Sequence, residues 1–136
     1  MKSFALDTGP IVALLNRRDS FHEWARDELD SLEPPLFTCE AVLSEACFLL
    51  RHIASGPDAV LALVDRGILR VDFRLADHVS ALRKLLSKYK SVPMSLADAC
   101  LVRMADIDAG LSIVTIDSDF HIYRRMGRHP IPLVAP

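Results

Sequence analysis

SFALDTGP, residues 3–10, is the stretch that decides the fold of this 136-residue chain. Its apolar first half is too short for a helix and is bounded by turn-forming residues, as in a buried strand. Asp7 stands where this strand ends, and Pro10 suits the first turn of a following helix. Open α/β sheets bind their ligands at this end of their strands. Taken alone, however, an aspartate at position 7 is fully explained as a helix cap or as part of an Asx turn.

Outward from this stretch, strand-like segments alternate with helical patterns. The sequence predicts further strands at residues 36–38, 68–73, 112–116 and 131–134, and helices at 10–16, 20–33, 40–53, 58–66, 75–89 and 95–109. The last strand contains a proline and is therefore predicted at an edge. The alternation indicates an α/β fold, with a parallel sheet covered by helices on both faces.

The composition is that of one globular domain, residues 1–136, with 51% hydrophobic and 25% charged residues. No apolar run reaches the ~20 residues of a membrane span, and the first residues lack the pattern of a signal peptide. The three cysteines lack zinc-site spacing, so we expect buried free thiols and a cytoplasmic protein.

Charge is unevenly distributed. The net charge of −2 argues against a protein that coats nucleic acid through bulk charge, but not against a nucleic-acid enzyme. The segment after Asp119 contains Arg124, Arg125 and Arg128 and no acidic residue. It could contact phosphates, or it could be an ordinary solvated surface.

Two acidic residues interrupt apolar helix faces. The neighbours of Glu45 one turn away on either side are all apolar, so we expect its carboxylate on a buried face, where it needs a cation or hydrogen-bond donors. Asp98 repeats this pattern on another helix. For Asp98 the spacing from Ser95 also fits a capping box, with the acid near the positive end of the helix.

A second strand end also carries an acid. Asp117 follows the predicted strand 112–116 as Asp7 follows the first strand. An Asx turn explains each aspartate singly, but not the recurrence at two strand ends and two helix faces. The ends of parallel strands share one edge, and clustered carboxylates there need a counter-charge such as Mg²⁺ or Mn²⁺. A cation held in this way commonly activates water against a phosphodiester.

In the order and spacing of these acidic segments the chain resembles the PIN domains, and most closely the VapC-type ribonuclease toxins of toxin–antitoxin pairs. The matching segments, in order along nearly the whole chain, are FALDT (4–8), VLSE (42–45), SLADA (95–99) and VTIDSDF (114–120). The resemblance implies a three-layer α/β/α sandwich with a central parallel sheet of five strands. It also implies that Asp7, Glu45, Asp98 and Asp117 bind Mg²⁺ or Mn²⁺.

The same resemblance implies an activity and partners. We expect endonucleolytic hydrolysis of single-stranded or looped RNA, a homodimer, and a cognate antitoxin that covers the site. Asp7, Asp98 and Asp117 would hold the cation, and Glu45 would bind it through water or act as a base. Thr8 and Thr115 match hydroxyl residues that support the site, and Asp119 matches an acid whose part varies within the family.

Three other functions fit parts of the sequence. Asp7-Thr8-Gly9 is also the motif of aspartic proteases, which a short chain could complete by dimerising, but that fold is nearly all β. A non-catalytic or non-toxin PIN module that binds RNA or a protein partner is a second alternative. Metal-free ribonuclease chemistry is a third, although the five histidines share no motif.

Overall fold

A five-stranded parallel sheet forms the centre of the protein in the computed structural model, which describes residues 2–136. The order of its strands is β3-β2-β1-β4-β7, so the strand that begins the decisive stretch is central. Its strands are β1 (Ser3–Leu6), β2 (Leu36–Phe37), β3 (Leu69–Arg70), β4 (Leu111–Val114) and β7 (Leu133–Val134). The predicted parallel sheet is confirmed, with its last strand at an edge.

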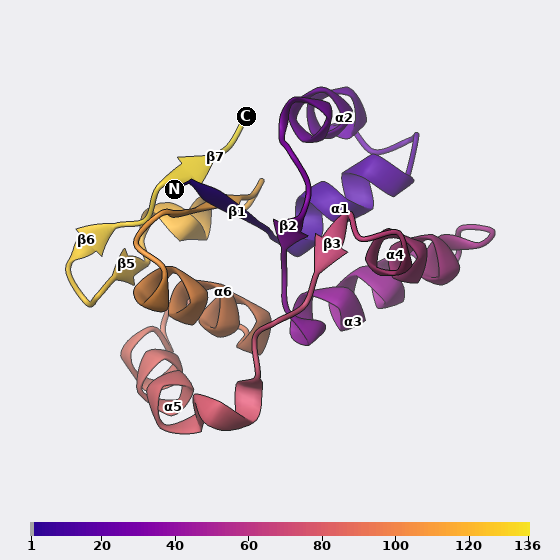
Figure 1. Ribbon diagram of the computed structural model, residues 1–136. Coiled ribbons are helices and arrows are strands. Elements are labelled where there is room, and N and C mark those ends of the chain that lie inside the picture. Colours follow the sequence, from indigo (N-terminus) through magenta and orange to yellow (C-terminus); the bar gives the residue numbers. More distant parts are fainter. Residues whose placement is uncertain (1) are drawn as a thin grey trace.

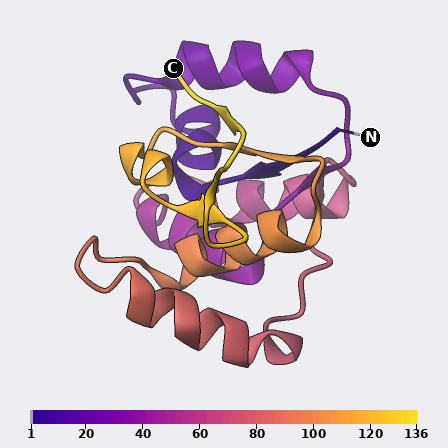
Figure 2. The ribbon, with the colours of Figure 1, turned by 90° about the vertical axis from the view of Figure 1, so that its left-hand side faces the viewer.

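Helices cover both faces of this sheet (Figures 1 and 2). α1 to α4 pack together on one face, and α5 and α6 pack on the other, which confirms the three-layer α/β/α sandwich. The helices are α1 (Thr8–Leu15), α2 (His22–Ser31), α3 (Glu40–Leu49), α4 (Gly56–Asp65), α5 (Val79–Lys88) and α6 (Leu96–Ile107), with 3₁₀ turns η1 (Leu75–Asp77) and η2 (Ser118–His121). Across the described residues, none of these helices has the length and apolarity needed to span a bilayer.

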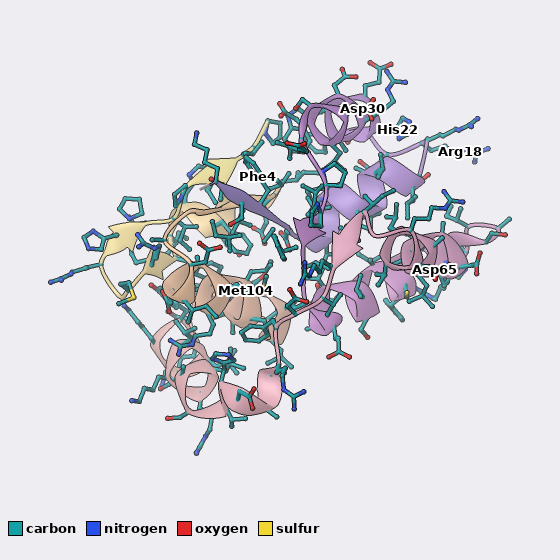
Figure 3. The ribbon with its side chains drawn as sticks, viewed as in Figure 1. Phe4, Arg18, His22, Asp30, Asp65 and Met104 are labelled. Carbon is teal, nitrogen blue, oxygen red and sulfur yellow. The ribbon has the colours of Figure 1, made fainter. Side chains whose placement is uncertain are left out.

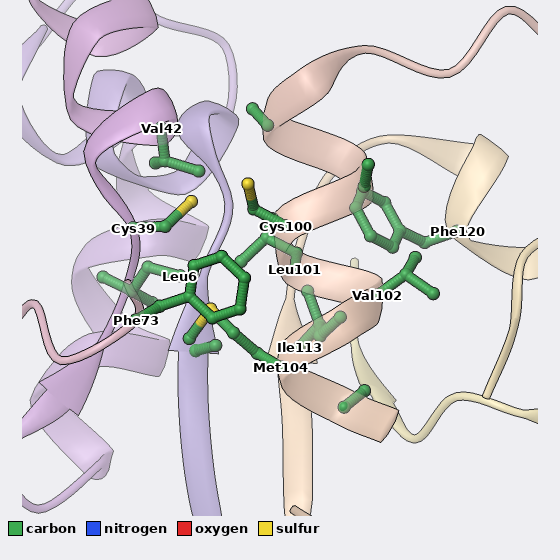
Figure 4. Packing of buried hydrophobic residues seen from close by; sticks show 14 of the residues in the cluster. Leu6, Cys39, Val42, Phe73, Cys100, Leu101, Val102, Met104, Ile113 and Phe120 are labelled. Carbon is green, nitrogen blue, oxygen red and sulfur yellow. The ribbon is translucent and has the colours of Figure 1, made fainter. Parts of the chain in front are cut away.

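The hydrophobic core lies on both sides of β1 and β4. α6 is buried along most of its length, and its Leu101 packs with Leu6 and Ile113 of the sheet (Figure 4). Met104 also lies inside, whereas charged side chains such as Arg18 project from the periphery (Figure 3). This packing holds the start of α6 against the ends of the central strands.

Two predicted helices are shorter than expected. The predicted helix 40–53 ends at Leu49, and the predicted helix 75–89 is divided into η1 and α5 at His78. The His78 ring stacks on Phe73 at 4.6 Å, and its Nδ1 accepts a hydrogen bond from Arg103. These contacts fix His78 in a non-helical conformation and interrupt the helix.

A small hairpin was not predicted. β5 (Arg124–Arg125) and β6 (His129–Pro130) form a two-stranded antiparallel sheet beside α6 (Figure 1). Its turn includes Gly127 at a φ of 77°, a conformation that glycine adopts readily. The Arg125 side chain fastens the hairpin to α6 by donating to the carbonyl of Ala105.

Candidate active site

Asp7 lies at the end of β1 and caps the N-terminus of α1. One carboxylate oxygen accepts a hydrogen bond from the backbone N–H of Thr8 and the other from the hydroxyl of Thr115, both at 2.7 Å. Burial raises the pKa of Asp7 to about 6; the two hydrogen bonds oppose this rise, and the negative charges of Asp98 and Asp117 add to it. Asp7 is thus a buried carboxyl group, and it lies close enough to Asp98 and Asp117 for their charges to raise its pKa.

Asp98 lies in the first turn of α6 and completes a capping box with Ser95. Its Oδ2 accepts from the Ser95 N–H, while its own N–H donates to the Ser95 hydroxyl. The hydroxyl of Tyr123, a fully buried residue, donates to the same Oδ2 at 3.0 Å. Burial raises the pKa of Asp98, and the charge of Asp117 raises it further. Burial beside this carboxylate also raises the pKa of Tyr123, which keeps the phenol protonated as a donor.

Asp117 caps η2, three residues beyond the end of β4. Its carboxylate accepts from the N–H of Asp119 in an Asx turn, as one interpretation of the sequence predicted. The N–H of Asp117 donates to the Thr115 hydroxyl, which in turn donates to Asp7. Thr115 therefore joins the ends of the two central strands.

Glu45 lies in the middle of α3, and the prediction that it occupies a buried face is wrong. Its side chain is exposed, and its neighbours Phe48 and Leu49 are 60% and 54% exposed. This side of α3 opens into a cleft, and no element of residues 2–136 covers it. The Thr8 hydroxyl donates to one oxygen of Glu45 at 2.9 Å, which turns the carboxylate toward Asp7.

All four predicted carboxylates line this one cleft, whose volume is about 450 Å³. Thr8, Ser95 and Asp119 line it as well, whereas Thr115 lies behind it, under Asp7. The structure therefore brings together acids that are up to 110 residues apart in the chain.

Helix starts account for the convergence of the three aspartates. Asp7, Asp98 and Asp117 each lie in the cap or first turn of a helix or 3₁₀ turn that begins at the carboxyl edge of the sheet. The N-terminal ends of helices carry a partial positive charge, which offsets part of the repulsion between the carboxylates. Cap and site are therefore not competing interpretations of these residues, because each aspartate lines the cleft while it caps a helix start.

The carboxylate oxygens in the cleft suit a hard, hydrated cation. Within residues 2–136, no three acidic, histidine or cysteine side chains stand close enough together to enclose an ion directly. Yet Asp98 Oδ1, Glu45 Oε1 and Asp117 Oδ2 accept no hydrogen bond from the described residues. An all-oxygen set with free lone pairs fits Mg²⁺ or Mn²⁺ bound partly through water, since Mg²⁺ usually keeps several waters.

Comparison with known proteins decides the family, because the PIN domain profile matches residues 4–126. The chain belongs to the PIN domain family. A search of curated proteins finds no match. The parallel α/β/α architecture of this chain also excludes the aspartic-protease interpretation of the Asp7-Thr8-Gly9 motif, because the aspartic-protease fold is nearly all β.

Solved structures that resemble this PIN domain include the following two. One is VapC20 of Mycobacterium tuberculosis, described as a sarcin–ricin loop cleaving toxin: 25% identity, a TM-score of 0.81, and coverage of 94% of this chain and 100% of that one. The other is a DNA-bound VapBC of Salmonella typhimurium: 21% identity, a TM-score of 0.53, and coverage of 99% and 98%. The second likeness concerns the fold alone.

One residue that contacts a carboxylate of the cleft was not predicted from the sequence. Tyr123 reaches Asp98 from the segment before β5, with its ring set edge-on to Phe120 and Tyr89. Nothing in the local sequence distinguishes a tyrosine whose hydroxyl meets a carboxylate from an ordinary core aromatic residue.

Proposed function

We propose that this PIN domain is a metal-dependent endoribonuclease and the toxin of a toxin–antitoxin pair. The observation that carries the proposal is the meeting of Asp7, Glu45, Asp98 and Asp117 in one cleft of a PIN fold. The likeness to VapC20, described as an RNA-loop-cleaving toxin and matched over its whole length, supports the choice of RNA as substrate.

Mg²⁺ or Mn²⁺ is the proposed cofactor, and when bound it supplies positive charge that activates the attacking water and stabilises the leaving oxygen. Asp7, Asp98 and Asp117 would hold the cation, directly or through water. Burial and the repulsion between neighbouring carboxylates raise the pKa values of Asp7 and Asp98, and a bound cation would relieve this repulsion.

The other cleft residues have separate roles in this proposal. Glu45, whose side chain is exposed at the cleft, would orient and deprotonate the attacking water. Thr8 directs the Glu45 carboxylate, and Thr115 directs that of Asp7. Asp119, whose N–H holds Asp117, has a side chain at the rim of the cleft and could assist the cation. Hydrolysis would leave a 5′-phosphate and a 3′-hydroxyl.

The biological setting follows from the same proposal. A cognate antitoxin would cover the cleft, as the likeness to the toxin VapC20 suggests. We further propose that residues 1–136 form a single domain that acts in the cytoplasm as a homodimer.

The test is cleavage of 5′-labelled structured RNA by the purified protein, with Mg²⁺ or Mn²⁺ and with EDTA. We expect cleavage with either ion, none with EDTA, and none by the D7N variant. The 5′ ends of the products should ligate without prior phosphorylation. Cleavage that resists EDTA would contradict the metal-dependent scheme, whereas RNA binding without cleavage under any metal would favour the non-catalytic PIN module.

A further inference from the structure

The charges of this chain are sorted into two regions. Residues 78–97 contain four lysines or arginines and residues 120–136 contain three, and neither segment contains an acidic residue. The rest of the chain carries all 18 acidic residues and only nine cationic ones. A net charge of −2 therefore conceals one strongly basic part and one strongly acidic part.

The two basic segments lie side by side in the fold. The amine of Lys88 at the end of α5 donates to the carbonyl of Gly127 in the β5–β6 turn. The Tyr89 hydroxyl accepts from the N–H of Arg124, and the Tyr89 ring packs edge-on against Tyr123 at 5.1 Å. α6 lies against both α5 and β5 (Figure 1). We call the surface formed by residues 78–97 and 120–136 the basic face.

The cations of the basic face are available to a ligand. Lys84, Lys88, Lys90 and Arg128 are exposed, and within residues 2–136 no cation of this face forms an ion pair. The neighbouring acid Asp106 is already engaged, because it accepts the N–H of Met126.

The basic face begins at the cleft. Pro93 and Ser95, near the end of the first basic segment, line the cleft, and Asp119, which also lines it, directly precedes the second segment. Tyr123 of the second segment donates to Asp98 in the cleft. A polyanion lying on the basic face would therefore lie next to the cleft.

We propose that the basic face binds the phosphate backbone of the RNA substrate next to the bond that is cut. This inference rests on the proposed function and adds where the substrate lies. Backbone phosphates are the ligands that exposed, unpaired lysines and arginines attract irrespective of sequence. The acid-rich remainder of the chain would repel RNA, so the two regions together would orient the strand.

Charge reversal tests this proposal with a matched control. The variant K90E/R128E changes two exposed cations of the basic face, and R17E/R18E changes two exposed cations outside it, with the same change in net charge. Binding of a fluorescent single-stranded RNA would be measured by anisotropy in EDTA, over a range of salt concentrations. Circular dichroism and thermal unfolding would check that each variant is folded.

For K90E/R128E we expect the salt slope of log K to fall by about 1.4 and the affinity to fall about 25-fold at about 0.1 M salt, since each lost contact with a single strand removes about 0.7 from the slope. R17E/R18E should stay within about twofold of the wild type. In cleavage assays K90E/R128E should change KM more than kcat, because neither residue lines the cleft.

Equal losses in the two variants would overturn the basic face as the RNA site while leaving the nuclease proposal intact. Failure of the wild type to cleave RNA would instead refute the proposed function. If K90E/R128E bound RNA as tightly as the wild type does but bound an acidic protein more weakly, the basic face would be assigned to a protein partner. That result would overturn the proposal. If K90E/R128E does not fold, K90Q/R128Q tests the same contacts and should show a smaller loss in the same direction.

Discussion

Replacing Asp7 by asparagine should make the metal-free protein more stable at neutral pH. Asp7 is 5% exposed, and its pKa rises from an ordinary 3.8 to about 6 on folding. Because the folded state binds the proton more tightly, the contribution of this group to stability is full below about pH 4 and is lost as the pH rises through about 6. The rise in pKa corresponds to a cost of about 3 kcal/mol at pH 7.

Asparagine keeps the local contacts while removing the charge. Its carbonyl oxygen can accept the N–H of Thr8, and its amide can donate to the Thr115 hydroxyl. The difference in unfolding free energy between D7N and wild type should therefore increase by about 3 kcal/mol between about pH 4 and pH 7 and then level off. At neutral pH this corresponds to about 10 °C in Tm.

Urea unfolding in EDTA, followed by the fluorescence of the single tryptophan, Trp24, measures this difference at each pH. Adding Mn²⁺ should stabilise the wild type and leave D7N nearly unchanged, because a ligand stabilises only the state that binds it. A D7N protein that is less stable than wild type at pH 7, or a difference that does not vary with pH, would refute the reasoning.

Three further substitutions separate chemistry from structure. E45Q should lower kcat by about 10²-fold or more in RNA cleavage while leaving Tm within about 2 °C, since the exposed side chain can still accept from Thr8. Y123F should lower stability by about 1–2 kcal/mol and weaken Mn²⁺ binding in calorimetry, because Asp98 loses a donor; unchanged Mn²⁺ affinity would show that the hydroxyl is only structural. G56A should destabilise the protein by about 1–3 kcal/mol in urea unfolding without changing kcat, because a Cβ would collide with the main chain of the preceding turn.

The sheet could be predicted because its signals are local. The run before Asp7 and the run before Asp117 are apolar, short and bounded by turn formers, and both are central strands. The parallel order followed from the alternation of strands with helices. Strand lengths were overestimated, because β2 and β3 pair over only two residues each although the apolar segments around them are longer.

The features that were missed depend on tertiary contacts. The helical pattern at 75–89 continues through His78, but the stacking of this ring on Phe73 ends the regular structure there. The apolar neighbours of Glu45 suggested burial, whereas two of them, Phe48 and Leu49, are exposed on the open side of α3. The β5–β6 hairpin has no strand-like alternation in its sequence, and it forms because its residues bond to α6 and α5.

The candidate site could be predicted by residue but not by geometry. Four acids at strand ends and helix faces indicated one cluster, and the structure brings them to one cleft. How each carboxylate is held could not be read from spacing, because Thr8, Thr115 and Tyr123 reach their partners across the fold.

The placement of three aspartates at helix starts has a consequence for how the protein tolerates change. Main-chain N–H groups of Thr8, Ser95 and Asp119 hold these carboxylates, and only a substitution by proline can remove such a donor. Mutations that loosen the interior would therefore shorten the lifetime of the protein before they disarrange its acids. Drift in the amino-acid sequence of the core can proceed far while the spacing of the cleft stays the same.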